Sequence, residues 1–457
     1  MSLSLICESG VGSVTGANFR FVRKEKGVEQ NILIDCGLIQ GSDQIELENR
    51  KQFAFDISTI DVLIITHAHL DHVGRIPKLI KEGYRGPIYS TPETRDLARL
   101  ILDDAVTLLA RSADRQKLEP MYSRDDVGAS FSNWHTVPYH QEKEIVPGIS
   151  IYFKDAGHIL GSAMVRVTAD GVTTMFSGDL GNTPAPLLRD TESVEGSDFL
   201  IMESVYGDRN HEPQDLRDKH FARIVRETVE RGGTAVIPAF SMERTQVLLY
   251  SLNNLVEQGL IPSVPVYIDS PLATRVTEVY RRGTELFNER VREQIRKGDD
   301  IFSFPRLTFV ASHGESQSLD NKPGAKIIIA GSGMSTGGRV IQHEAAYAPD
   351  PNSTIVLVGY QTLGTLGRAL AEGAKKISVG GQKIPVRARI ETLYGFSAHK
   401  DSDNLVQYAA TAANSLKQVF VAMGEPKASL FLAQRLRDEV GLNALYPEKG
   451  KEYILKP

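Results

Sequence analysis

The sequence predicts an α/β protein of two domains, and three observations lead to this prediction. At 457 residues the chain is too long for one ordinary hydrophobic core. Short apolar runs read as buried strands, and many of them end in a polar residue or a glycine turn. In the middle of the chain these runs alternate with segments of helical spacing, which is typical of a parallel sheet covered by helices.

Composition favours a soluble globular protein. Hydrophobic residues make up 41% of the chain and charged residues 24%, and we find no apolar run of about 18 residues that would indicate a transmembrane helix. The segment 1–8 lacks the basic region and apolar core of a secretory signal. Because only Cys7 and Cys36 are present, a reducing cytoplasm is the expected location. The net charge of −5 predicts no global attraction to nucleic acid, so any polyanion site must be a local groove.

A dense group of metal-ligand residue types follows the apolar run 62–65. It consists of His67, His69, Asp71 and His72. Imidazole and carboxylate are ligands that zinc accepts, and α/β proteins place their chemistry at the carboxyl ends of parallel strands. The spacing suits His67 and His69 to one metal ion and lets the next two ligands reach a second. Isolated histidines are usually surface or core residues, but this combination is improbable by chance.

Polar residues also follow other predicted strands. They are Asp35 after 31–34, His158 after 149–154, Asp179 after 173–177 and Glu203 after 199–202. Together with His67, this recurrence predicts one site assembled at one edge of a sheet.

The central segment contains a glycine-rich loop at 331–338, before a predicted helix that contains Arg339. Its backbone N–H groups can cradle a phosphate at the start of that helix. The loop lacks the Gly-Lys-Ser/Thr ending of a P-loop, and a tight structural turn is an equally good reading. Helices are expected at 92–110, 216–230, 242–255 and 427–440, and further strands at 234–238, 266–268, 326–330, 355–358 and 418–422.

Taken together, the motifs resemble a known family. The segment 67–72 with His158 and Asp179 is similar to the successive metal motifs of the metallo-β-lactamase fold, and Asp35 to its first motif. Other segments resemble the β-CASP nucleases, the group of the RNA 3′-end-processing endonuclease subunit of the cleavage and polyadenylation machinery and its bacterial and archaeal homologues. These segments are Glu203–Arg209, Pro238–Ser241, Asp269–Ala273, Gly331–Met334 and Phe396–His399.

The resemblance implies a metallo-β-lactamase αββα sandwich with an inserted α/β β-CASP domain. The sandwich would comprise residues 1–205 and 386–457, and the inserted domain residues 206–385. The resemblance covers nearly the whole chain, with its motifs in the family's order.

The resemblance also implies the roles of the site residues. One zinc ion would be held by His67, His69 and His158, a second by Asp71 and His72, with Asp179 bridging and Asp35 supporting the ligands without touching the metal. A zinc-activated hydroxide would attack phosphorus in line. His399 would be the general acid and Glu203 would orient it or the water, so these two and Asp71 are the expected catalytic residues. From the residues alone, His399 could equally be a hydrogen-bonded loop histidine.

One position departs from the family pattern. Nucleolytic members supply a further histidine to the second zinc, and here Met423 stands at the matching place. A thioether is a weak ligand for zinc. We therefore expect one tight zinc site and a weaker second one.

The expected partner is single-stranded RNA, with no membrane; a homodimer is left open. Candidate contacts to RNA phosphates are Arg209, Arg244, Arg275, Ser332, Gly333, Arg339 and Arg368. For any one of the arginines, ordinary surface ion pairing is the competing reading.

The sequence thus predicts a zinc-dependent ribonuclease that hydrolyses phosphodiester bonds. The alternative is a weakly catalytic or non-catalytic RNA-binding paralogue that acts with a partner, which the change at Met423 suggests. A lactamase or thioesterase is disfavoured by the central insertion.

Overall fold

The computed structural model describes residues 2–40, 43–359, 361–362 and 364–456, which form two compact units. The first unit contains Met1–Asn210 and His399–Pro457, and the second contains His211–Ala398. The domain boundaries expected at 205/206 and 385/386 stay a prediction. In the described part of the chain, no helix combines the length and the apolar character needed to cross a membrane.

Two mixed seven-stranded sheets form the centre of the first unit. In spatial order, the first sheet contains β22 (Glu452–Leu455), β1 (Ser2–Ser9), β2 (Asn18–Glu25), β3 (Val28–Ile34), β4 (Val62–Ile64), β5 (Ile88–Ser90) and β6 (Trp134–Thr136). The second contains β21 (Ala444–Leu445), β20 (Gln418–Val421), β11 (Phe199–Met202), β10 (Val172–Phe176), β9 (Ala163–Ala169), β8 (Ile149–Asp155) and β7 (Glu142–Val146). Strands β3 to β6 are parallel, as are β10, β11, β20 and β21.

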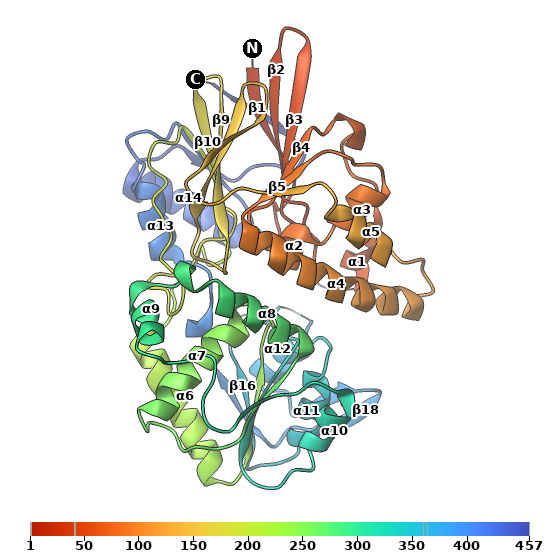
Figure 1. Cartoon of the computed structure of the whole chain (residues 1–457), viewed down its shortest axis with the longest axis vertical. Helices are drawn as coiled ribbons and strands as arrows, with labels where there is room; N and C mark the ends of the chain where they lie inside the picture. The colour runs from red at the N-terminus through yellow and green to blue at the C-terminus, as the bar shows by residue number, and fades with distance from the viewer. Residues whose placement is uncertain (1, 41–42, 360, 363, 457) are drawn as a thin grey trace. The chain divides into compact units, whose positions relative to one another are not determined.

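Helices flank the strands of this unit on both sides (Figure 1). On one side lie α2 (Leu70–Val73), α3 (Ile76–Lys81), α4 (Pro92–Arg115) and α5 (Arg124–Ser130), and on the other α13 (Ser402–Ala410) and α14 (Pro426–Val440); α1 spans Asp43–Arg50. Side chains of both sheets share one buried cluster, to which Ile34 and Ile64 contribute from the first sheet and Phe153 and Phe176 from the second. The layers are therefore helix, sheet, sheet and helix.

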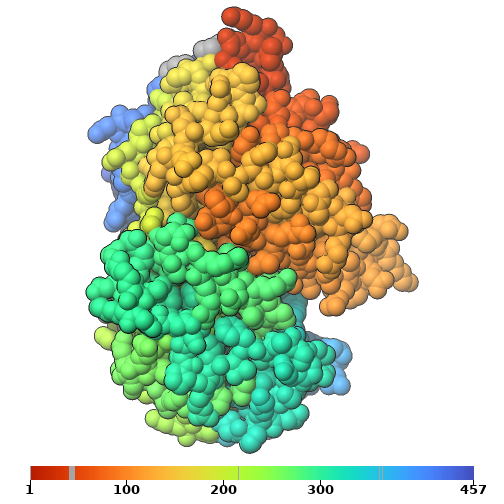
Figure 2. All heavy atoms as spheres, in the orientation of Figure 1, coloured from red at the N-terminus to blue at the C-terminus, as the bar shows by residue number. Residues whose placement is uncertain are grey.

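Helix α4 begins with local features that the sequence supplies. The hydroxyl of Thr91 accepts a hydrogen bond from the amide of Thr94, and Pro92 occupies the first turn. The hydroxyls of Thr91 and Thr94 also donate to the carbonyl of Gly161, at 2.6 and 2.8 Å. The start of α4 therefore anchors the loop that follows β8. Along the rest of the helix, one face is buried, with Leu97 and Leu102, and the other lies at the surface (orange in Figure 2).

The second unit is built on a six-stranded parallel sheet. Its spatial order is β14 (Leu307–Phe309), β13 (Val266–Asp269), β15 (Lys326–Ala330), β12 (Thr234–Pro238), β16 (Thr354–Leu357) and β19 (Arg389–Thr392). The helices are α6 (Gln214–Glu230), α7 (Arg244–Glu257), α8 (Pro271–Arg282), α9 (Glu289–Arg296), α10 (His313–Leu319), α11 (Val340–Tyr347) and α12 (Leu366–Ala371), and β17 (Lys376–Val379) and β18 (Gln382–Pro385) form a hairpin. The predicted alternation of strands and helices around a parallel sheet is confirmed.

One expectation from the sequence is wrong. The polar residues at strand ends do not share one sheet, because Asp35 and His67 follow β3 and β4 of the first sheet, whereas His158, Asp179 and Glu203 follow strands of the second. A hydrophobic pattern identifies strands but not which strands hydrogen-bond to one another, so it could not separate the two sheets.

Candidate metal centre and acid pair

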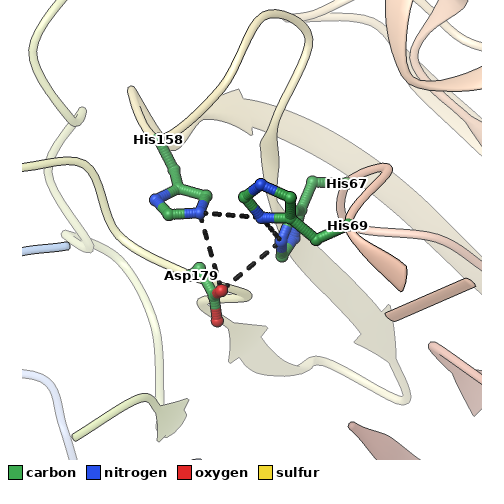
Figure 3. Close-up of side chains that lie close together, drawn as sticks. All are labelled: His67, His69, His158 and Asp179. Atoms are coloured by element: carbon green, nitrogen blue, oxygen red, sulfur yellow. Dashed lines mark hydrogen bonds and ion pairs between the residues drawn. The ribbon is translucent and has the colours of Figure 1, made fainter. Parts of the chain in front are cut away.

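Three imidazole rings of the first unit point toward one another (Figure 3). Nδ1 of His69 lies 3.2 Å from Nε2 of His67 and 3.1 Å from Nε2 of His158. One oxygen of Asp179 lies 3.4 Å from the His67 nitrogen and 3.6 Å from the His158 nitrogen. Three nitrogens and one carboxylate oxygen converging in this way form a donor set that suits a divalent metal such as zinc.

The electrostatics of the three rings also suit a metal. Burial lowers the pKa of His67, and lowers those of His69 and His158 well below the ordinary value, despite the nearby Asp179 carboxylate. The rings are therefore neutral near pH 7, and a neutral imidazole has the lone pair that metal coordination requires.

A second group of ligand atoms shares Asp179 with the first. It contains Asp71, His72 and Asp179. Nε2 of His72 lies 3.3 Å from the other oxygen of Asp179, and neither buried atom has a hydrogen-bond partner among the described residues. Buried polar atoms left without hydrogen bonds mark a place for an ion. The two oxygens of Asp179 thus face two different ligand groups, as a bridging carboxylate requires.

Asp35 holds the ligands from behind. One of its oxygens lies 2.7 Å from Nδ1 of His72, and its two oxygens accept the amide and the hydroxyl of Thr66, each at 2.8 Å. The hydroxyl of Thr66 also lies 3.0 Å from Nδ1 of His67. Thr66 is not among the residues predicted from sequence, although its position directly before His67 at a strand end points to it. Hydrogen bonds of this kind fix the tautomer and orientation of a metal-binding imidazole.

The backbone after β3 fixes the short helix α2, which carries Asp71 and His72. The amides of Cys36 and Leu38 donate to the carbonyls of His72 and Leu70 at 2.8 and 3.0 Å. Gly37 lies between them, and a Cβ atom there would be 1.5 Å from the carbonyl oxygen of Asp71. Only glycine permits this approach, so the sequence Cys36-Gly37 positions the ligands of the second group.

His399 and Glu203 form a pair beside the first group. Nδ1 of His399 lies 3.1 and 3.2 Å from the two oxygens of Glu203, and the ring centroid lies 4.6 Å from that of His158. Burial opposes a charge on His399, but the carboxylates of Glu203, Asp179 and Asp71 raise its pKa to about 9. An imidazole that is protonated at neutral pH can donate a proton.

Met423 is buried and belongs to the core between the sheets. It lines a small cavity together with Asp35 and His72, and its sulfur would be 2.7 Å from a Cβ atom at Gly10. Met423, at the position where the resemblance implies a histidine, therefore lies on the His72 side of the site.

The candidate RNA contacts differ in their exposure and in the partners that they already have within the protein. Arg209 pairs with Asp208, Arg339 with Asp269 and Arg368 with Glu372, whereas Arg275 is exposed. In the glycine loop, the amide of Ser332 donates to the carbonyl of Gly337, and Gly333 packs against Phe240. Arg244 is buried, and its Nε and Nη1 atoms have no hydrogen-bond partner among the described residues.

Three family models match the chain. They are the metallo-beta-lactamase superfamily domain at residues 26–194, the Beta-Casp domain at 245–370 and the Zn-dependent metallo-hydrolase RNA specificity domain at 383–447. Ribonuclease TTHA0252 of Thermus thermophilus is 36% identical over 379 residues, which is 83% of this chain and 85% of that protein. The chain belongs to the metallo-β-lactamase-fold β-CASP ribonuclease family.

Other relatives of this β-CASP protein agree. The RNase J-like protein of Methanocaldococcus jannaschii is 31% identical over 439 residues, 94% of each chain. The transcription termination factor FttA of Methanosarcina mazei is 36% identical over 426 residues; these are 89% of this chain but 65% of the factor. A solved protein of unknown function from Enterococcus faecalis matches over both full lengths with a TM-score of 0.56 at 13% identity, which supports the fold alone.

Proposed function

We propose that this β-CASP protein is a metal-dependent ribonuclease that hydrolyses RNA phosphodiester bonds. The observation that carries the proposal is the proximity of two ligand groups sharing Asp179 to the Glu203–His399 pair, in a chain of this family. A metal centre alone is common to many hydrolases of the fold, so the acid pair and the Beta-Casp match narrow the substrate class.

We further propose that the metal is zinc and that there are two sites. His67, His69 and His158 would hold the first ion, Asp71 and His72 the second, and Asp179 both. When bound, such ions activate water and neutralise charge on the phosphoryl oxygens. The mixture of imidazole and carboxylate favours zinc over magnesium, which prefers oxygen ligands alone.

The protein's own groups would complete the chemistry. Glu203 holds Nδ1 of His399, and the protonated ring would donate a proton to the leaving oxygen. The amide of Leu180 donates to Glu203 at 2.7 Å and keeps the carboxylate in place. Asp35 and Thr66 orient His72 and His67 from behind.

We propose that the substrate is single-stranded RNA and that the protein acts in the cytoplasm. The ligand atoms lie deep, since the side chains of His67, His158 and Asp179 are at most 4% exposed. A single strand can bend a phosphate into such a centre more readily than a rigid duplex can. A homodimer stays a prediction that light scattering can test.

The test is cleavage of a fluorescent single-stranded RNA by protein saturated with zinc or manganese. Cleavage should disappear with a chelator and return with added metal. His69→Ala, which removes the ring between the other two, should be inactive. Hydrolysis of a lactam or a thioester with intact RNA would overturn the substrate assignment.

A second candidate function is favoured by Met423 alone. If the second metal site cannot fill, the chain would bind RNA without cutting it and would act beside an active partner. Tight RNA binding by the metal-saturated protein, without turnover, would select this alternative.

A further inference from the structure

The segment 239–244 of the second unit, where β12 leads into α7, carries two side chains that the proposed chemistry does not use. Phe240 is 42% exposed, although it is aromatic, and Arg244 begins α7 with its side chain only 9% exposed. An exposed aromatic ring and a buried cation four residues apart in one segment suggest a ligand site.

Arg244 forms an ion pair with Glu243 but has fewer partners than its burial requires. Its Nε and Nη1 atoms have no hydrogen bond within the described part of the chain, and Nη2 lies 3.6 Å from the nearest oxygen of Glu243. By contrast, the buried Arg217 donates two hydrogen bonds to Asp218, and Arg339 donates to Asp269. Buried guanidinium donors without acceptors are costly, so they mark the place of an anion that accepts from them.

Phe240 is held as a rigid platform. Its carbonyl accepts hydrogen bonds from the amide and the hydroxyl of Thr245, at 3.2 and 2.8 Å. One face of the turn packs on Gly333, where an added Cβ atom would lie 2.8 Å from the Phe240 ring. The ring is thus fixed on the protein side and open to solvent on the other, as base stacking requires.

The topology places this turn where parallel sheets bind ligands. Strands β12 and β16 are neighbours, but the chain leaves β12 toward β13 on one side and leaves β16 toward β19 on the other. Gly359 follows β16, and a Cβ atom there would be 4.0 Å from the Arg244 guanidinium. Arg244 therefore lies at the carboxyl edge of the sheet at a switch point, where open α/β sheets form their ligand crevice.

We propose that the β12–α7 turn is a nucleotide subsite for RNA, in which Arg244 binds a backbone phosphate and Phe240 stacks on an adjacent base. This inference rests on the proposed function, because it takes RNA as the ligand. It names two residues of the second unit that would act in binding and not in the chemical step.

The test measures RNA binding by metal-free protein, so that cleavage does not interfere. Fluorescence anisotropy with a labelled oligouridylate and an abasic oligonucleotide of equal length separates the two contacts. Phe240→Leu should lower the affinity for the oligouridylate about tenfold and leave the affinity for the abasic strand unchanged, because only a base can stack on the ring. Arg244→Ala should lower the affinity for both strands alike, and Arg244→Lys should recover part of the lost affinity.

Matched controls exist elsewhere in the chain. Phe431→Leu removes an aromatic ring that is 49% exposed on α14, and Arg281→Ala removes a guanidinium that already pairs with Asp300; neither should change binding. If the wild type binds RNA and the Phe240→Leu protein binds both strands as tightly, the inference is overturned while the proposed function stands. If the metal-free wild type binds no RNA, the same titration is made with the metal-loaded His399→Ala protein, in which cleavage is slow; no RNA binding there overturns both. Because Phe240 is exposed, its variant remains informative even if Arg244→Ala does not fold.

Discussion

Both oxygens of Glu203 face Nδ1 of His399, at 3.1 and 3.2 Å. The carboxylate is itself fixed, because one of these oxygens accepts the amide of Leu180. The backbone of His399 pairs with Gly181 in an isolated β-bridge, and the amide of Lys400 donates to the carbonyl of Leu180. The loop after β10 therefore supplies Asp179 to the metal groups and also positions the acid pair.

The contact between Glu203 and His399 predicts the effect of removing the His399 imidazole. His399→Ala should lower kcat by roughly 100-fold or more, because general acid catalysis typically contributes that much. Metal content should not change, since Asp179 keeps its other partners. Single-turnover cleavage and metal analysis of the same preparation measure the two effects, and loss of metal would instead make His399 a ligand. Glu203→Gln should act in the same direction, and the double variant should show less than the sum of the two effects.

Asp35 supports a second prediction. Asp35→Asn replaces one of the oxygens that serve Thr66 and His72 with an amide, so His72 loses its orienting acceptor. Affinity for the second metal should fall about 10- to 100-fold, as for other outer partners of metal ligands. Competition with a chromophoric chelator measures this. The control is Asp61→Asn, a carboxylate that accepts the amide of Asn31 away from the site and should leave metal affinity unchanged.

Much of the fold was accessible from sequence because apolar runs determine strands locally. The strands at 199–202 and 326–330 were predicted to the residue. The hydrophobic pattern alone could not assign each strand to one of the two sheets. Strands β3 and β4 belong to the first sheet and β10 and β11 to the second, and this division depends on contacts across the whole unit.

The residues of the candidate site also fall into those that the sequence predicts and those that it does not. His67, His69, His158 and Asp179 were visible as ligand types at strand ends, and the structure brings them together. Thr66 was not predicted, and Phe240 entered only as part of the family-like segment Pro238–Ser241, because a threonine or an aromatic ring has no chemical signature until its neighbours are known. The free donors of Arg244 likewise depend on what surrounds the side chain.

The second unit contains a group that predicts how stability depends on pH. His343 is buried with Nε2 2.8 Å from Asp269 and Nδ1 2.7 Å from Asp320. Burial opposes its charge, but the two carboxylates raise its pKa to about 9, above the ordinary value of 6.5. The protonated ring therefore stabilises the folded state fully below pH 6.5, and this contribution is lost as pH rises through 9.

The measurable consequence is a loss of roughly 3 kcal/mol between these pH values, from 1.36 kcal/mol for each pKa unit. His343→Gln should remove this pH dependence from the free energy of unfolding, measured with urea at pH 6.5 and 9.5. His135→Gln, at an exposed position, is the control and should behave as the wild type. Equal slopes for His343→Gln and the wild type would mean that the ring is neutral in the folded protein.

The last prediction concerns the second metal position. Asp71, His72 and Asp179 are three ligands, and Met423 offers only a thioether where the family has an imidazole. After dialysis, the wild type should hold one metal ion per chain, at the three-histidine group. Met423→His should raise the content toward two, as measured by mass spectrometry of the metals. The backbone permits this change, since position 423 has φ = 47°, a left-handed conformation that histidine tolerates better than most residues.

Met423→Leu is the matched control, because it keeps the apolar volume without adding a ligand and should leave the metal content at one. Two equally tight ions in the wild type would contradict the prediction. Glu425, two residues after Met423 and directly before α14, would then be the first residue to substitute, because a carboxylate can coordinate zinc where a thioether binds it only weakly.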